Sequence, residues 1–438
     1  MTATLVHAAA ATREITPRRP LRLAGFASRT TDFEDVAEPI HLTALALSGP
    51  EAEEPPLVLI AADLICWNPS LLVPLRARLE AETGLPAWRF VFSATHNHSG
   101  PATGADFLPS IGIPDPEYLE LLCNETAAAV REALTGRRPL RLSFAETTSN
   151  IGVYRRGLRN GRMMMAPNYD VPIDRRLSLL RLVDPETGEL AVGMIHFACH
   201  ASVTADNRLS GDYPGALLNK LRAEHPGSHW LFLQGSCGDI RANVVIGDLF
   251  SRCDQECMRR FAARLGESLA VLLNSAPPDV NLQSFVPRLL RSQVELPLTE
   301  LVTREELEAD VDSSDPSRAD RARRLLARLN AADSGWGSRT LDIALLQIAP
   351  DLALFMLAAE VCGAYGDVIR RAGALRGLTI LPVSCSEGMV GYVATASQIA
   401  EGGYEPRESA WYFALEGTYD SVIESRITAA IQSLIERL

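Results

Sequence analysis

Two histidines one residue apart follow an apolar run early in the chain. Residues 90–92 (FVF) lead into the segment 93–101 (SATHNHSGP), where a Ser-Gly-Pro turn ends the run. Side chains at positions i and i+2 of a strand project from the same face. We therefore expect His96 and His98 to reach one small volume at a strand end, where imidazoles hold a metal or move protons. The short pattern is weak by itself and depends on what other segments add.

Later apolar runs also end in polar residues. His200 follows the strand-like run 192–197, at the kind of position where α/β proteins gather their ligands. His196, inside that run, is expected to be a hydrogen-bonded core residue. Glu360 ends the apolar run 352–359, where a carboxylate is costly to bury without a cation or a metal beside it.

Two tyrosines, a glycine-containing block and an arginine pair complete the candidate set. Tyr392 and Tyr404 each directly follow a glycine. The block 234–243 (QGSCGDIRAN) follows another apolar run, and its glycines allow close approach of the backbone. Its spacing fits neither a P-loop nor a nucleophile elbow. The local pair Arg155 and Arg156 suits an anionic group on a small molecule better than a polymer.

The elements that must position these residues alternate between strand-like and helical patterns. Strands are expected at 56–61, 90–93, 179–182, 192–197, 230–233 and 352–356, and helices at 71–83, 117–135, 214–225, 255–274 and 419–438. Because the strands are near-continuously apolar, the pattern predicts the α/β class, with a mainly buried mixed sheet flanked by helices in one large domain.

Two segments depart from this alternation. Residues 299–330 are rich in charged and small residues and are broken by SSDP at 313–316, which predicts an insertion of one or two exposed helices. Residues 157–170 contain three consecutive methionines and are interpreted as a mobile loop. That loop is expected either to form a flexible lid or substrate-facing surface, or to pack on the core.

Composition excludes several classes of protein. The 438 residues carry a formal net charge of −12, which disfavours a nucleic-acid partner. No apolar stretch approaches the ~20 residues of a membrane span, and the start lacks a signal-peptide pattern. We expect a cytoplasmic protein; the sequence does not indicate its oligomeric state.

The eight cysteines lie mostly in apolar surroundings, which predicts reduced thiols. Cys253 and Cys257 lack the two-residue spacing of a zinc knuckle and have no matching second pair. We interpret their proximity in the sequence as a coincidence.

Taken in order, these motifs resemble the catalytic N-terminal part of the neutral, non-lysosomal ceramidase family. The resemblance covers most of the chain and rests on GFA at 25–27, THNHSGP at 95–101, the histidine segment 197–202, SGD at 210–212, the block 234–243, Ala359-Glu360 and the two tyrosines. It implies a divergent member whose ceramidase-like catalytic domain spans 1–438, with the helical insertion at about 299–330 and no C-terminal immunoglobulin-like domain.

The resemblance also implies the composition of the site. One Zn²⁺ per chain would be bound by His96, His200, Glu360 and Tyr392. Catalytic roles fall to His98 as proton shuttle, Arg155 near the scissile amide and Tyr404 as donor to the oxyanion. Apart from the resemblance, we expect Gly25, Arg156 and Arg241 to bind substrate. Tyrosine is an unusual ligand, because the metal must lower its pKa from about 10.

The chain departs from the family where Arg241 stands in place of an active-site serine. A guanidinium there suits a substrate with a carboxylate or phosphate, unless it pairs with Asp239 instead. The sequence therefore predicts a zinc-dependent amidohydrolase that cleaves a linear N-acyl bond with a metal-activated water. Its substrate would be a small molecule other than ceramide, with an anionic group as a candidate feature. The alternatives are a zinc-dependent esterase or lactonase, and a non-catalytic relative that binds a ligand.

Overall fold

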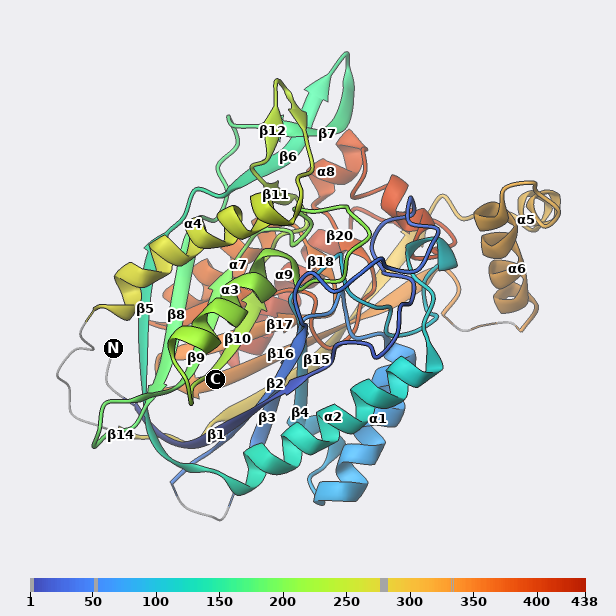
Figure 1. Cartoon of the computed structure of the whole chain (residues 1–438). Coiled ribbons are helices and arrows are strands. Elements are labelled where there is room, and N and C mark those ends of the chain that lie inside the picture. The colour runs from blue at the N-terminus through green and yellow to red at the C-terminus, as the bar shows by residue number, and fades with distance from the viewer. Residues whose placement is uncertain (1–3, 51–53, 276–282, 332, 334) are drawn as a thin grey trace.

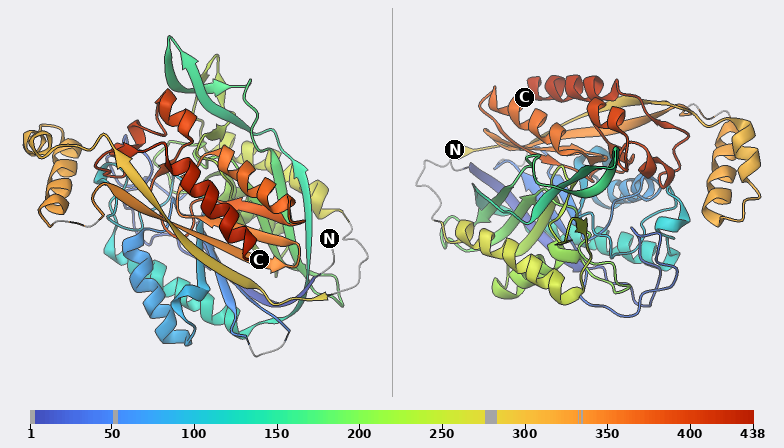
Figure 2. Two further views of the ribbon diagram at one scale, coloured as in Figure 1. Left: turned by 180° about the vertical axis from the view of Figure 1, so that it is seen from behind. Right: turned by 90° about the horizontal axis from the view of Figure 1, so that it is seen from above.

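Near-continuous apolar strands need cover on both faces of their sheet, and here two stacked sheets and outer helices provide it (Figure 2). The computed structural model describes residues 4–50, 54–275, 283–331, 333 and 335–438. The layers run helices, sheet, sheet, helices. The predicted α/β class is confirmed, although the mainly buried strands form two large sheets.

The first large sheet is mixed and strongly curved (Figure 1). In order of pairing its strands are β10 (His229–Gln234), β9 (Leu190–Phe197), β8 (Arg176–Val183), β5 (Arg138–Thr148), β1 (Thr4–Glu14), β2 (His41–Ser48), β3 (Leu57–Ala62) and β4 (Phe90–Ala94). The pairs β3/β4 and β9/β10 are parallel, as is the pair of β1 with the short β14 (Gln283–Ser284). The other neighbours are antiparallel.

The second sheet lies across the inner face of the first. Its strands, in order, are β19 (Thr379–Val383), β17 (Leu352–Leu357), β16 (Ser338–Ala349), β15 (Arg288–Thr299) and β21 (Thr418–Tyr419). Leu45 and Leu59 of the first sheet share one apolar cluster with Leu346 and Leu354 of the second. All four are at most 1% exposed, and burial of each such side chain contributes roughly 1.5–3 kcal/mol.

Helices cover the outer faces of both sheets. On the first sheet lie α1 (Pro69–Thr83), α2 (Pro116–Thr135), α3 (Asp212–Glu224) and α4 (Gln255–Leu273). On the second lie α7 (Gly363–Ala374) and α9 (Ile423–Glu436). The expected helices and strands are all present, with ends shifted by a few residues. In the described part of the chain, no helix has the length and apolar character needed to cross a membrane.

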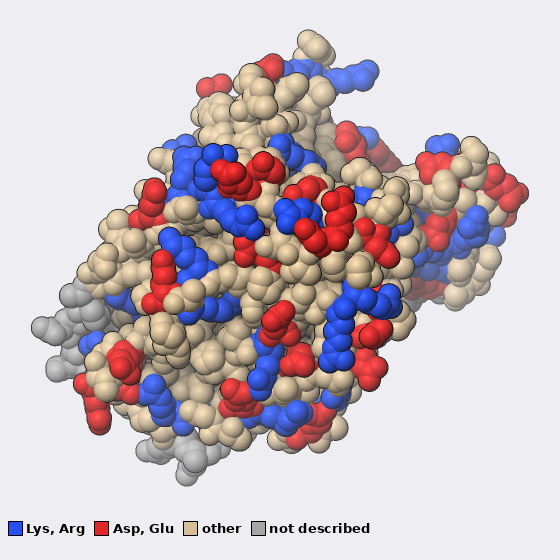
Figure 3. All heavy atoms as spheres, in the orientation of Figure 1, with Lys and Arg blue, Asp and Glu red and all other residues tan. Residues whose placement is uncertain are grey.

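The predicted insertion consists of two helices that project from the body (Figure 1). They are α5 (Arg304–Asp310) and α6 (Pro316–Asn330), separated at the predicted break. Leu307, Ala322 and Leu325 form a small apolar cluster between them. On the face that Figure 3 shows, acidic and basic side chains are intermingled over the body and over this insertion.

The prediction of a mobile loop at residues 157–170 is wrong. β6 (Gly152–Arg159) and β7 (Arg162–Asn168) form a hairpin, and β11 (Ile240–Ala242) pairs with its first strand. The connecting residues Asn160 and Gly161 have φ values of 50° and 75°, as two-residue hairpin turns require. The short elements β12 (Val245–Ile246), β13 (Leu249–Phe250), β18 (Glu360–Val361), β20 (Tyr392–Val393) and α8 (Ala396–Glu401), and three 3₁₀ turns at Ala87–Arg89, Pro109–Ile111 and Glu408–Trp411, complete the fold.

The cysteine prediction is wrong for one pair. Cys253 and Cys257 form a disulfide, with their Cα atoms 5.6 Å apart. Cys253 precedes the helix-capping residue Asp254, and Cys257 lies in the first turn of α4, so the cap brings the two together. The other six cysteines are free, and most of them are buried, as expected.

Candidate metal centre and its cavity

The curvature of the first sheet brings distant strand ends together. β10, at one end of the strand order, lies against β2, β3 and β4 at the other. A hydrogen bond from Thr43 Oγ1 to Trp230 O (3.0 Å) joins β2 to β10. The loops that follow β4 and β9 then meet, since His98 N donates to Ala201 O at 3.1 Å. His96, His98 and His200 are therefore neighbours although 104 positions separate the outer two.

Glu360 reaches the same place from the second sheet. The main chain of Cys385 bridges the sheets: its N–H donates to Ala359 O and its carbonyl accepts from Ala94 N, each at 3.0 Å. Glu360 in β18 pairs in parallel with Tyr392 in β20. The hydrophobic stacking of the two sheets thus places a carboxylate and a phenol opposite the histidines.

The two histidines of the H-x-H segment meet for a different reason from the one expected. β4 ends at Ala94, so both lie in a loop, and His96 has a left-handed φ of 60°. Even so, His96 Nε2 lies 3.2 Å from His98 Nε2 and 3.0 Å from His200 Nε2. The expected shared volume is confirmed, but the strand geometry predicted for it is wrong.

Main-chain carbonyls fix the proton on each imidazole. The Nδ1 atoms face Ile65 O for His96 (2.8 Å), Gly25 O for His98 (3.1 Å) and Cys237 O for His200 (3.2 Å). A carbonyl oxygen can only accept, so each Nδ1 carries a proton and each Nε2 is the nitrogen left to bind a metal. The three Nε2 atoms therefore face one another, which is the arrangement of histidines that bind a metal.

A carboxylate adds to this set of acceptors. Glu360 Oε2 lies 2.9 Å from His96 Nε2 and 3.3 Å from His200 Nε2. Burial alone would raise the pKa of Glu360, but the two histidines outweigh it and hold the pKa well below its usual range. A single proton can satisfy only one of these contacts, whereas one divalent cation satisfies all of them. The donor set therefore fits a metal ion.

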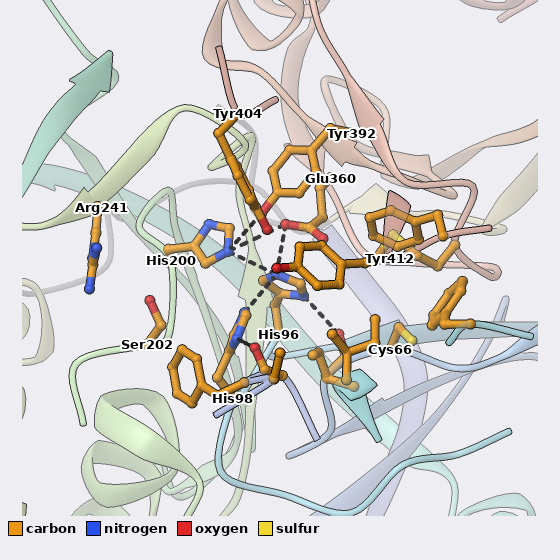
Figure 4. A pocket seen from close by; sticks show the side chains of 18 of the residues that line it. Cys66, His96, His98, His200, Ser202, Arg241, Glu360, Tyr392, Tyr404 and Tyr412 are labelled. Atoms are coloured by element: carbon orange, nitrogen blue, oxygen red, sulfur yellow. Dashed lines mark hydrogen bonds and ion pairs between the residues drawn. The ribbon is translucent and has the colours of Figure 1, made fainter. Parts of the chain in front are cut away.

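The tyrosines complete the ring of polar groups (Figure 4). Tyr392 Oη lies 3.4 Å from His200 Nε2, and the rings of Tyr392 and Tyr404 are in contact at 5.5 Å. Burial raises the pKa of both hydroxyl groups. Tyr412, which the sequence analysis did not single out, also lines the cavity, and its hydroxyl points towards the histidines (Figure 4).

The polar groups open into a cavity of about 280 Å³. One end is apolar, formed by the contiguous side chains of Ile65, Cys66, Phe107, Met389 and Phe413. Arg241 and Ser202 lie at the opposite side of the histidine cluster from Cys66 (Figure 4). The candidate centre thus stands between an apolar end and a basic end.

Comparison with known proteins gives a fold but no sequence match. No protein-family model matches the chain, and no curated protein matches it. The crystal structure of neutral ceramidase from Pseudomonas aeruginosa superposes with a TM-score of 0.74 and 17% identity, covering 99% of this chain and 75% of that one. A structure of ceramidase complexed with C2 superposes with a TM-score of 0.75 and 16% identity, and the match covers 99% of this chain and 76% of that one. The chain has the neutral ceramidase fold.

Within this ceramidase-like fold, Arg155 lines the same cavity as the histidines. Its Nε donates to Glu405 Oε1 at 2.7 Å, and its guanidinium stands 5.2 Å from the ring of Tyr392. Its Nη1 is also 3.5 Å from His200 Nδ1, longer than the contact of that nitrogen with Cys237 O. Its buried Nη2 has no hydrogen-bond partner among the described residues. That N–H group is free to serve a ligand in the cavity.

Arg156 does not line the cavity. It donates to Glu405 Oε2 (2.6 Å) and Glu401 Oε2 (2.9 Å) and to the main-chain oxygens of Gln398 and Gly402. Both guanidiniums bind Glu405, but those further contacts to Glu401, Gln398 and Gly402 occupy Arg156 away from the cavity. Its expected contact with substrate is corrected to a supporting role, in which it holds Glu405 against Arg155.

Gly25 and Arg241 both line the cavity, in different ways. Gly25 presents its carbonyl to His98, which makes it part of the histidine support. Arg241 does not pair with Asp239, whose carboxylate accepts from Gly363 N and Gln398 Nε2. That alternative is therefore wrong. His196, by contrast, is a core residue as expected, with Nε2 2.7 Å from Pro382 O.

Proposed function

We propose that this chain is a zinc-dependent hydrolase that cleaves the amide bond of a small N-acyl substrate. The observation that carries the proposal is the convergence of three histidine Nε2 atoms and Glu360 Oε2 at the wall of a cavity. The likeness to solved ceramidases supports the fold on which such a site would stand.

The residues we propose as zinc ligands are His96, His200, Glu360 and Tyr392. Imidazole nitrogen with carboxylate and phenol oxygen is a donor set that suits zinc better than magnesium or calcium. A bound zinc ion supplies Lewis acidity and lowers the pKa of a coordinated water towards ~7.

His98 is proposed to move protons. Glu360 Oε2 contacts His96 and His200, whereas no contact of His98 with Glu360 is found among the described residues. The ring of His98 instead packs on Phe26 at 5.1 Å, on the cavity wall. Its Nε2 lone pair is therefore the one best placed to take a proton from water and return it to the leaving amine.

Arg155 and Tyr404 are proposed to stabilise the oxyanion. Arg155 and Tyr404 both line the cavity, with the guanidinium 5.6 Å from the Tyr404 ring, and Nη2 of Arg155 has no hydrogen-bond partner among the described residues. Glu405 fixes the guanidinium, so the donor is in place before the reaction begins. Such preorganised donors stabilise charge that develops on a carbonyl oxygen.

Metal content and hydrolysis test the proposal together. Purified protein should contain about one zinc per chain, lose amide hydrolysis on treatment with 1,10-phenanthroline, and regain it with added zinc. Matched acyl amides and esters measured side by side decide the bond that is cleaved. Absence of bound metal together with chelator-resistant activity would refute the proposal, and activity on esters alone would replace it with an esterase. The cytoplasmic location stays a prediction.

A further inference from the structure

The basic end of the cavity contains an arginine without a carboxylate partner. Arg241 is 8% exposed, and its described contacts are Met165 Sδ at 3.4 Å and the ring of Phe250 at 4.9 Å. Neither neutralises a charge. A buried cation without a counter-ion is costly, so the position calls for an anion from outside the chain.

The charges around Arg241 strengthen this conclusion. Burial, Arg252 and Arg155 lower the pKa of Arg241 to about 10, so it remains a cation at neutral pH. The charge of Arg155 is already matched by Glu405, and that of Arg156 by Glu405 and Glu401. The guanidinium of Arg241, in contrast to these two, has no carboxylate partner among the described residues.

A second arginine stands at the same end. Arg252, which the sequence analysis did not single out, is exposed and lines the cavity. Its guanidinium lies 3.8 Å from the centroid of the Phe26 ring. It forms no ion pair among those found in the described part of the chain. Arg241 and Arg252 thus place two cations at the basic end of the cavity, and burial holds Arg241 in position.

The position of this pair relative to the candidate centre defines a substrate axis. Figure 4 shows Arg241 on the side of His200 and Ser202, and Cys66 on the opposite side of His96. Cys66 belongs to the apolar end, where the rings of Phe107 and Phe413 pack at 4.8 Å. An amide held at the centre would thus extend an apolar group in one direction and a charged group in the other.

We propose that Arg241 and Arg252 bind the carboxylate of an N-acyl amino acid, whose acyl chain lies against the apolar end. This inference rests on the proposed amide hydrolysis for its substrate class. Arginine pairs with carboxylate through two parallel hydrogen bonds, a geometry that a lone neutral headgroup does not offer. The cavity volume of about 280 Å³ favours a compact substrate.

Three substrates with the same acyl chain test whether the enzyme prefers a negative charge at the amine end, and whether that charge must be a carboxylate. N-octanoylglycine, N-octanoylglycinamide and N-octanoylphosphoethanolamine differ at the amine end alone. The wild-type zinc enzyme should hydrolyse the glycine conjugate with a kcat/KM about 10- to 100-fold above that of the glycinamide. Equal rates for these two would overturn the proposal, and preference for the phosphate would overturn the carboxylate assignment.

Substitution of single arginines tests which of them causes the preference for the charged substrate. Arg241→Met should remove the preference for the charged substrate, while Arg241→Lys should keep part of it, because the charge remains and the paired hydrogen bonds do not. Arg252→Met should reduce the preference by a smaller factor, about 3-fold to 10-fold, because its side chain is exposed. Arg162→Met, an exposed position in β7 of the hairpin with which β11 pairs, serves as the control and should change nothing. A preference that survives Arg241→Met contradicts the assignment.

A binding measurement separates this inference from the proposed function. The ketone 4-oxoundecanoate has the shape of N-octanoylglycine but no bond to hydrolyse, and 4-oxoundecanamide is its neutral partner. Calorimetric titration should show at least about 10-fold tighter binding of the acid, lost in Arg241→Met. Such binding without turnover of any amide would sustain the anion site and refute the hydrolase. Hydrolysis of neutral amides without this difference in binding would support the hydrolase and refute the anion site.

Discussion

Gly25 and His98 fit each other so closely that the glycine has no room for a side chain. Gly25 O accepts the hydrogen bond of His98 Nδ1 at 3.1 Å, and a Cβ atom on Gly25 would stand 2.6 Å from that same nitrogen. Gly25 also has a φ of +95°, which other residues rarely adopt. The glycine therefore sets both the tautomer and the orientation of His98.

Gly25→Ala should accordingly displace the His98 ring. We expect kcat to fall by about 10- to 100-fold, with bound zinc retained, because a small misplacement of a catalytic group is costly. Gly161→Ala is the matched control, since Gly161 also has a positive φ (+75°) but no described atom lies within 4 Å of where its added methyl group would stand. The control should share the backbone strain and keep its activity. Equal losses of activity in both variants would contradict the role given to Gly25.

Substitution of single histidines should separate metal binding from proton transfer. His96→Ala and His200→Ala each remove an Nε2 that contacts Glu360, and both should lose zinc and activity. His98→Ala should retain zinc and lose about 10²- to 10⁴-fold in rate. Elemental analysis of the three purified variants, beside steady-state kinetics, makes the comparison. Loss of zinc from His98→Ala would make His98 a ligand.

Glu405 should matter for stability as well as for the position of Arg155. It is 3% exposed and forms ion pairs with both Arg155 and Arg156, so Glu405→Gln leaves two buried cations short of a counter-ion. We expect a loss of about 3–5 kcal/mol in the free energy of unfolding, measured with urea. Glu401→Gln is the control, because its side chain is 45% exposed and contacts the same Arg156. That variant should lose less than about 1 kcal/mol.

The same ion pairs predict a pH dependence of stability. Burial raises the pKa of Glu405, but Arg155 and Arg156 outweigh this and leave the pKa below its ordinary value. Ionised Glu405 therefore stabilises the folded protein fully above the pKa of an unfolded glutamate, about 4.3. This stabilisation is lost as the pH falls through the lower pKa that Glu405 has in the folded protein. Urea unfolding between pH 7 and pH 3 should show a weaker acid dependence in Glu405→Gln than in wild type. Identical slopes would contradict the assignment.

Much of the fold was predictable because buried strands leave a plain signal. The runs at 90–93, 192–197 and 352–356 became β4, β9 and β17, since continuous apolar sequence needs a sheet covered on both faces. The stacking of two sheets was not predictable, because an apolar strand does not reveal whether a helix or another sheet covers it. The hairpin over 157–170 was missed although its Asn-Gly turn is a recognised signal.

Some residues of the candidate site could also be predicted from the sequence, and others could not. His96, His200, Glu360 and Tyr392 were identified by resemblance, and the structure brings them together. Arg156 was misplaced because its neighbour Arg155 lines the cavity, whereas its own guanidinium is taken up by Glu405 and Glu401. Arg252 carries no local sequence signal; only the folded chain places it at the cavity.

The most direct test of the metal centre is a crystal structure of the purified protein with anomalous diffraction recorded on both sides of the zinc absorption edge. We predict one strong peak bounded by His96 Nε2, His200 Nε2 and Glu360 Oε2, present above the edge and absent below it. Electron density that shows no anomalous peak there, with the three imidazoles hydrogen-bonded only to water or to one another, would contradict the account.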